Sequence, residues 1–132
     1  MKIDGECHCG QITFEAEVDP EKTSVCHCTD CQTLSGASYR ASVAVAPKHF
    51  SLLTGELASY VKVADSGNRR VQTFCPRCGS PIYATGYGDP TSMLNIRIGV
   101  IRQRNELSPK RQIWARSRQH WTTDLSAIPE QA

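Results

Sequence analysis

The stretch Cys75-Pro76-Arg77-Cys78-Gly79 places two cysteines three positions apart across a predicted tight turn. Pro76 fixes the backbone of the turn, and Gly79 permits a positive φ directly after the second cysteine. This spacing is typical of a zinc knuckle, in which both thiolates of the pair bind one ion. A closed tetrahedral zinc site needs four ligands, so the knuckle requires a second pair from elsewhere in the chain.

All seven cysteines of the 132-residue chain belong to three clusters. Besides the knuckle, these are Cys7-His8-Cys9 near the N-terminus and Cys26-His27-Cys28-Thr29-Asp30-Cys31. Four thiolates close a structural zinc site, whereas three with an open fourth position are typical of a catalytic one. The odd count therefore predicts one zinc ion that holds the fold together and one that takes part in chemistry.

Disulfide bonds are the competing explanation for so many cysteines. They form in oxidising compartments, and small secreted domains pair their cysteines in even numbers. Here the count is odd, and residues 1–6 have neither the apolar core nor the cleavage site of a signal peptide. We therefore favour metal binding, and reduced cysteines predict a cytoplasmic protein.

The two cysteine pairs together make one set of four, which leaves the middle cluster as a set of three. The alternative joins Cys7 and Cys9 to part of the middle cluster, but it leaves the knuckle without its remaining ligands. We expect two zinc ions, and we expect the middle one to be lost more easily because its coordination is incomplete. The predicted structural ligands are Cys7, Cys9, Cys75 and Cys78, and the predicted catalytic ligands are Cys26, Cys28 and Cys31.

The other polar residues of the clusters have less specific interpretations. In extended backbone, residues two apart point to the same face, so His8 and His27 point away from their neighbouring sulfurs. A surface or partly packed histidine is the favoured interpretation of both. For Asp30, capping of a short helix is favoured over a supporting role beside the metal.

Composition limits the function classes further. The chain is 39% hydrophobic and 21% charged, has a net charge of +2, and contains no apolar run long enough to span a membrane. Its cations are nevertheless concentrated in the C-terminal third. They are compatible with a solvated basic face, with an anionic small ligand or with nucleic acid. They are Arg97, Arg102, Arg104, Lys110, Arg111, Arg116 and Arg118.

The hydrophobic pattern is mainly that of β-strands. Residues 11–18 alternate between polar and apolar, as a half-buried strand does. Asp65-Ser66-Gly67-Asn68 is a hairpin signal, and residues 29–35 predict a short helix ended by Gly36. We predict one domain of short antiparallel strands over residues 1–126 and a frayed tail over 127–132. Further strands are predicted over residues 24–26, 39–46, 50–53, 57–63, 70–74, 81–85, 92–101 and 112–115.

With these motifs placed, the chain resembles the glutathione-dependent formaldehyde-activating enzymes, the family that also contains centromere protein V. The resemblance covers most of the chain and depends on the order and spacing of the cysteine clusters. It includes Gly10 after the first cluster, Ser35-Gly36 after the second, Phe74 before the knuckle, and the late Trp114 and Trp121. After Gly99 the chain departs from the family pattern, with Val100-Ile101-Arg102-Gln103 in place of a Thr-Leu-Asp-like stretch.

The resemblance implies a mainly β, zinc-binding domain of the β-tent type and the same division of the cysteines into two sets. It also implies a carbon–sulfur lyase similar to S-(hydroxymethyl)glutathione synthase, which adds a small thiol such as glutathione to formaldehyde. Arg97 and Arg102 are candidates to hold a carboxylate of such a thiol. One alternative is a non-catalytic zinc scaffold that binds protein or, less favoured, nucleic acid through the basic C-terminal third. Another is a structural protein whose middle zinc is closed by a fourth ligand such as a histidine.

Overall fold

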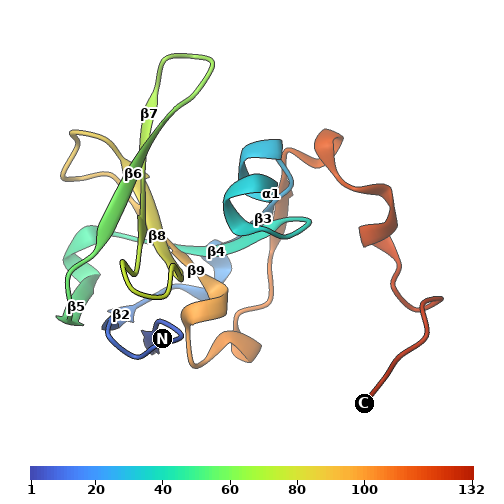
Figure 1. The fold of residues 1–132 in the computed structure, drawn as a ribbon, viewed down its shortest axis with the longest axis horizontal. Coiled ribbons are helices and arrows are strands. Elements are labelled where there is room, and N and C mark those ends of the chain that lie inside the picture. The colour runs from blue at the N-terminus through green and yellow to red at the C-terminus, as the bar shows by residue number, and fades with distance from the viewer.

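Two β-sheets pack against a shared core in the computed structural model, which describes residues 1–132 (Figure 1). The smaller sheet has the order β1-β2-β5 and is antiparallel throughout. In β2 the predicted alternation is confirmed, because Phe14 and Ala16 are buried between more exposed neighbours. The strands of this sheet are β1 (Lys2–Glu6), β2 (Thr13–Glu17) and β5 (Phe50–Thr54).

The larger sheet has seven strands in the order β10-β3-β4-β9-β8-β7-β6, and the mainly β prediction is confirmed. Every pair in it is antiparallel except β10 and β3. A parallel pair requires a long connection, and here almost the whole domain lies between the two strands. The strands are β3 (Thr23–Cys26), β4 (Arg40–Val45), β6 (Ala58–Val63), β7 (Arg69–Phe74), β8 (Pro81–Gly86), β9 (Leu94–Arg97) and β10 (Arg111–Ile113).

One short helix, α1 (Thr29–Ser35), follows β3 and ends at Gly36, whose φ of 65° is left-handed as predicted. The cap at its start differs from the prediction, because the Sγ of Cys28 accepts the N–H of Cys31 and Asp30 lies inside the first turn. No helix is long and apolar enough to cross a membrane. The chain also contains short 3-10 helices, which are η1 (Pro20–Lys22), η2 (Pro47–His49), η3 (Ile98–Val100), η4 (Arg104–Glu106), η5 (Ala115–Ser117) and η6 (His120–Thr123).

The strand predicted over residues 92–101 is shorter than expected. It is extended only over β9, and the chain then turns through η3, where the N–H of Ile101 binds the carbonyl of Ile98. This turn allows Ile101 to pair with Gly5 of β1 and to become fully buried. Strand β1 was not predicted, because Ile3 is its only large apolar residue and gives too weak an alternation.

Alternation along the strands gives the larger sheet two different faces. In β4 and β9, Val43 and Ile96 point into the core and are fully buried. Arg40 and Arg97, which belong to the opposite face, are also buried but lie outside this cluster. The core cluster consists of Ile3, Cys7, Ile12, Phe14, Ala16, Val18, Val43, Val45, Cys75, Ile82, Leu94, Ile96, Ile101 and Leu107.

Gly5 lies where the smaller sheet meets the η3 segment, and a substitution at this position tests the packing between them. A Cβ at this position would overlap the carbonyl oxygen of Val100 and the ring of Phe14. We expect Gly5→Ala to lower the free energy of unfolding by about 1–3 kcal/mol, the usual cost of overpacking a core. Denaturant melts should show this loss. Gly99→Ala is the matched control, since a Cβ there meets nothing within 4 Å, and equal melts for the two variants would contradict the packing.

Candidate metal centres and the adjoining cavity

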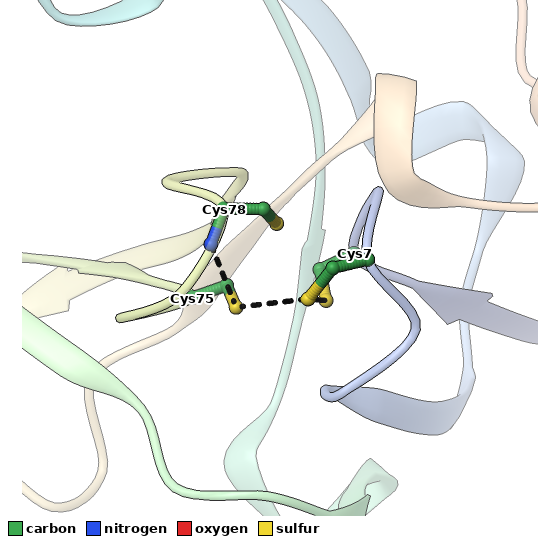
Figure 2. Close-up of side chains that lie close together, drawn as sticks. Cys7, Cys75 and Cys78 are labelled. Carbon is green, nitrogen blue, oxygen red and sulfur yellow. Dashed lines mark hydrogen bonds between the residues drawn. The ribbon is translucent and has the colours of Figure 1, made fainter.

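Four cysteine sulfurs from two distant parts of the chain converge at the edge of the core. Those of Cys7, Cys9, Cys75 and Cys78 all lie within 4.8 Å of one another. The Cys7 and Cys9 sulfurs are 3.5 Å apart, and Cys9 is 3.7 Å from Cys75. Figure 2 shows the labelled side chains of Cys7, Cys75 and Cys78 turned toward one another. Cys7 and Cys75 are members of the hydrophobic core, so this group joins the two sheets.

Backbone amides around these sulfurs make the group suitable for thiolates. The N–H of Ile12 donates to the Sγ of Cys7 at 3.2 Å, and the N–H of Arg77 donates to the Sγ of Cys75 at 3.4 Å. Hydrogen bonds from the Ser80 hydroxyl, 3.2 Å from the Sγ of Cys78, and from the backbone of Ser80 and Cys9 lower the pKa of that thiol to about 5. Four sulfur donors with such support fit a tetrahedral zinc ion, which prefers thiolate ligands in closed sites.

The second group comprises the three cysteines of the middle cluster. The sulfurs of Cys26, Cys28 and Cys31 lie within 4.8 Å of one another, at the end of β3 and the start of α1. The helical turn brings Cys31 back over Cys28, whose Sγ accepts the Cys31 N–H at 3.2 Å. The neighbouring Cys31 lowers the pKa of Cys26, and Cys26 together with burial raises the pKa of Cys31.

No fourth histidine, cysteine, aspartate or glutamate joins this group. His27, the neighbour in sequence, is buried, and its Nε2 lies 2.8 Å from the Oε1 of Gln112. Asp30 forms an ion pair with the Nζ of Lys62 at 2.7 Å. The structure thus brings together the two predicted sets of cysteines, and both could hold a metal ion; which ion they bind, and with what role, stays a prediction.

A cavity of about 220 Å³ adjoins the middle cluster. Its floor is the face of the larger sheet that points away from the core. Strand register aligns this floor, because Cys26 is opposite Arg40 on β4, and Ser42 is opposite Arg97 on β9. Trp114 lines the rim and is the only non-glycine residue with a positive φ, at 53°. The floor is completed by Ser24, Lys62, Arg70, Gln72, Ala84 and Asn95.

Arg40 and Arg97 place two positive charges in this cavity with little exposure to solvent. Their guanidinium groups donate to the same oxygen, the Oε1 of Gln72, at 3.0 and 2.8 Å. Burial lowers the pKa of both, and the charge of Arg40 adds to the effect on Arg97, whose pKa falls to about 9. The nearby cysteines oppose this shift, as a negative charge beside a guanidinium should.

Sequence reasoning found Arg97 but missed Arg40, Gln72 and Lys62. The one available signal was the presence of charged and polar residues on the non-core face of β-patterned segments. Arg102, the other candidate for a substrate carboxylate, lies elsewhere and forms an ion pair with Asp4 at 2.8 Å.

The cations of the C-terminal third do not form one surface. Arg97 lines the cavity beside the cysteines, whereas Arg102 and Arg104 line a separate pocket. Lys110 and Arg111 line a third cavity of about 630 Å³, which contains Val25 and His27 and therefore lies on the other face of the β3 segment. This scattering does not favour a single basic face for nucleic acid.

The comparisons agree with this architecture. The family model described as "Glutathione-dependent formaldehyde-activating enzyme" matches residues 2–117. The chain belongs to this family. A crystal structure of a Rhodobacter sphaeroides protein has a similar fold, with a TM-score of 0.63 and 16% sequence identity over 83% of this chain and 98% of that chain. No curated protein matches the chain significantly.

The four-sulfur group should be necessary for folding. We expect Cys75→Ser to give insoluble or unfolded protein, because zinc binding to structural sites can supply roughly 10–16 kcal/mol. Cys28→Ser, in the other group, is the matched control and should keep its fold. Circular dichroism and thermal melts make the comparison. A folded Cys75→Ser protein with an unchanged melting temperature would exclude a structural role for this group.

Metal content separates the two groups. We expect fresh protein to carry up to two zinc ions per chain, with the ion of the three-sulfur group lost first during dialysis against a weak chelator. Cys28→Ser should retain only the tightly held ion. Mass spectrometry under native conditions and elemental analysis provide the count. Retention of two ions by Cys28→Ser would show that this cysteine is not a ligand.

Proposed function

We propose that this protein is a zinc-dependent carbon–sulfur lyase that joins a small thiol, such as glutathione, to an aldehyde, such as formaldehyde, and cleaves the adduct in reverse. The observation that carries the proposal is a three-sulfur group with no fourth protein ligand, which lines a cavity. A closed structural site would have its fourth ligand, whereas an open one leaves room for a reactant.

The chemistry requires a thiolate at neutral pH. A zinc ion held by Cys26, Cys28 and Cys31 would polarise a thiol in its open position and lower the pKa of that thiol. In the overall reaction a sulfur–carbon bond forms, the carbonyl π bond breaks, and the thiol proton ends on the former carbonyl oxygen. The reaction involves no oxidation or reduction, so no further co-reactant is needed.

Residues of the cavity support this reaction through charge and position. Arg40 and Arg97 lie close enough to the cysteines for their positive charges to favour the anionic form of a sulfur. The ion pair between Lys62 and Asp30 joins β6 to the first turn of α1. That pair would hold the helix, and with it Cys31, in place over the sheet.

The proposed catalytic unit comprises residues 1–126, with 127–132 as an appended tail. The last 3-10 helix, η6, ends at Thr123, and residues 124–132 are exposed. Figure 1 shows the C-terminal segment extending away from the sheets that carry the cysteines. We propose a cytoplasmic enzyme, because its thiolates must stay reduced.

Cys28→Ser should abolish the activity while leaving the fold intact. Exchange spectroscopy by NMR can follow the interconversion of formaldehyde and its glutathione adduct in the presence of the protein. We expect wild type to accelerate the exchange and Cys28→Ser to leave it at the uncatalysed rate, because one of three metal ligands is lost.

The matched control is His8→Ala, which alters an exposed side chain beside the other cysteine group. Its exchange rate should equal that of wild type. A Cys28→Ser protein as active as wild type would mean that the middle cluster is not the catalytic centre. Absence of acceleration by wild type, with glutathione and with other small thiols, would reject the enzyme proposal for these substrates.

A further inference from the structure

Two arginines beside the middle cluster lack the anionic partner that buried arginines normally have. Arg40 is 6% exposed and Arg97 is 8% exposed. The four ion pairs of the structure involve neither of them. A buried charge without a partner is strongly unfavourable, so such groups are usually paired or bind a ligand.

The hydrogen bonds of these arginines are also incomplete. Both donate to the Oε1 of Gln72, and Arg97 further donates to the Ser42 hydroxyl at 2.8 Å. The Nε of each guanidinium is buried and has no partner. Neutral oxygens therefore hold the two groups in position without neutralising them.

The cavity as a whole carries an excess of positive charge, which would attract an anion. Lys62 forms an ion pair with Asp30, the one carboxylate that lines the cavity. The other cations of the lining, Arg40, Arg70 and Arg97, form no ion pair. Three thiolates around a divalent ion would carry one net negative charge, which is less than the three guanidinium charges. A thiolate reactant would remove one of the two remaining positive charges, so a further negative group would still be attracted.

The size of the cavity indicates a small occupant. Its volume of about 220 Å³ lies below the roughly 300–1,000 Å³ typical of pockets for drug-sized ligands. A guanidinium offers parallel N–H donors whose spacing matches the two oxygens of a carboxylate. A small reactant with a carboxylate close to its reacting atom meets both requirements.

We propose that Arg40 and Arg97, held in position by Gln72, bind the carboxylate of a small reactant. The inference rests on the proposed function and specifies its substrate class. The carboxylate has two possible sources, the thiol or the aldehyde, and in the second case the electrophile is an α-oxo acid. The sulfur then adds to the aldehyde carbon, the thiol proton passes to the carbonyl oxygen, and the carboxylate is unchanged.

Isothermal titration calorimetry on zinc-loaded protein tests the proposal without an activity assay. Mercaptoacetate is compared with its neutral amide, and glyoxylate with glycolaldehyde. We expect the carboxylate of at least one pair to bind at least tenfold more tightly. Preference in the first pair alone assigns the carboxylate to the thiol, and preference in the second alone assigns it to the aldehyde. Equal binding within both pairs overturns the proposal.

Arg97→Met and Arg40→Met should each remove this preference, because they should weaken the binding of the carboxylates far more than that of the neutral compounds. Arg69→Gln is the matched control on β7, since Arg69 is exposed and stacks on Tyr87. We expect the melting temperature of Arg97→Met to stay level or rise, because an unpaired buried charge is removed. A marked fall, with both members of each pair bound equally poorly, would indicate a structural role and would contradict the proposal.

Arg97→Lys provides a second variant if a methionine variant fails to fold. It keeps the positive charge but loses the planar fork, so the preference should weaken; a full preference in this variant would contradict bidentate binding by Arg97. Failure of the proposed function has a different signature. If the protein prefers carboxylates but has no exchange activity, the enzyme proposal is rejected and the anion site is retained. If it has exchange activity but no preference, the anion site is rejected and the enzyme proposal is retained.

Discussion

The convergence of Cys7, Cys9, Cys75 and Cys78 is the constraint on which the rest of the structure depends. These sulfurs connect the loop after β1 to the turn between β7 and β8, and two of them are part of the buried core. A single ion bound here would close a loop of more than sixty residues, and its binding free energy would then also be folding free energy. The larger sheet is held against the smaller one at this point.

The two-residue period of the strands then divides the larger sheet into a structural face and a chemical face. Val43 and Ile96 pack against the smaller sheet, while their neighbours Ser42 and Arg97 belong to the opposite face. A shift of one residue in either strand would exchange the two faces. The strand register that places the apolar side chains in the core therefore also determines which side chains lie beside Cys26 in the cavity.

The electrostatics of that cavity differ from those of an ordinary protein interior. Arg40 and Arg97 are buried close to each other, share one neutral acceptor and have no carboxylate partner. Folding alone does not favour such an arrangement, since an unpaired buried charge is destabilising. Unfavourable local interactions of this kind are expected where a site binds a ligand. The same charges would favour thiolates and attract an anionic reactant.

The sequence by itself determined the parts of this protein that depend on local spacing. The turn at Gly79, the helix ended by Gly36 and the alternation around Phe14 are properties of neighbouring residues, and all three could be predicted. The odd number of cysteines likewise suggested a group of three. Two features were not predicted. Cys28, a member of the sulfur group, caps α1 in place of Asp30. Strand β9 ends early because Ile101 pairs with Gly5 of β1.

Only the tertiary structure decided which distant residues surround the middle cluster. Arg40, Gln72 and Arg97 come from three strands, and cross-strand register is not encoded in the local pattern of any one of them. Arg97 and Arg102 looked equivalent as candidates in the sequence, yet one lines the cavity and the other is paired with Asp4 on the surface. Only the four residues 98–101 separate them, and the backbone changes there from strand to turn because of long-range packing.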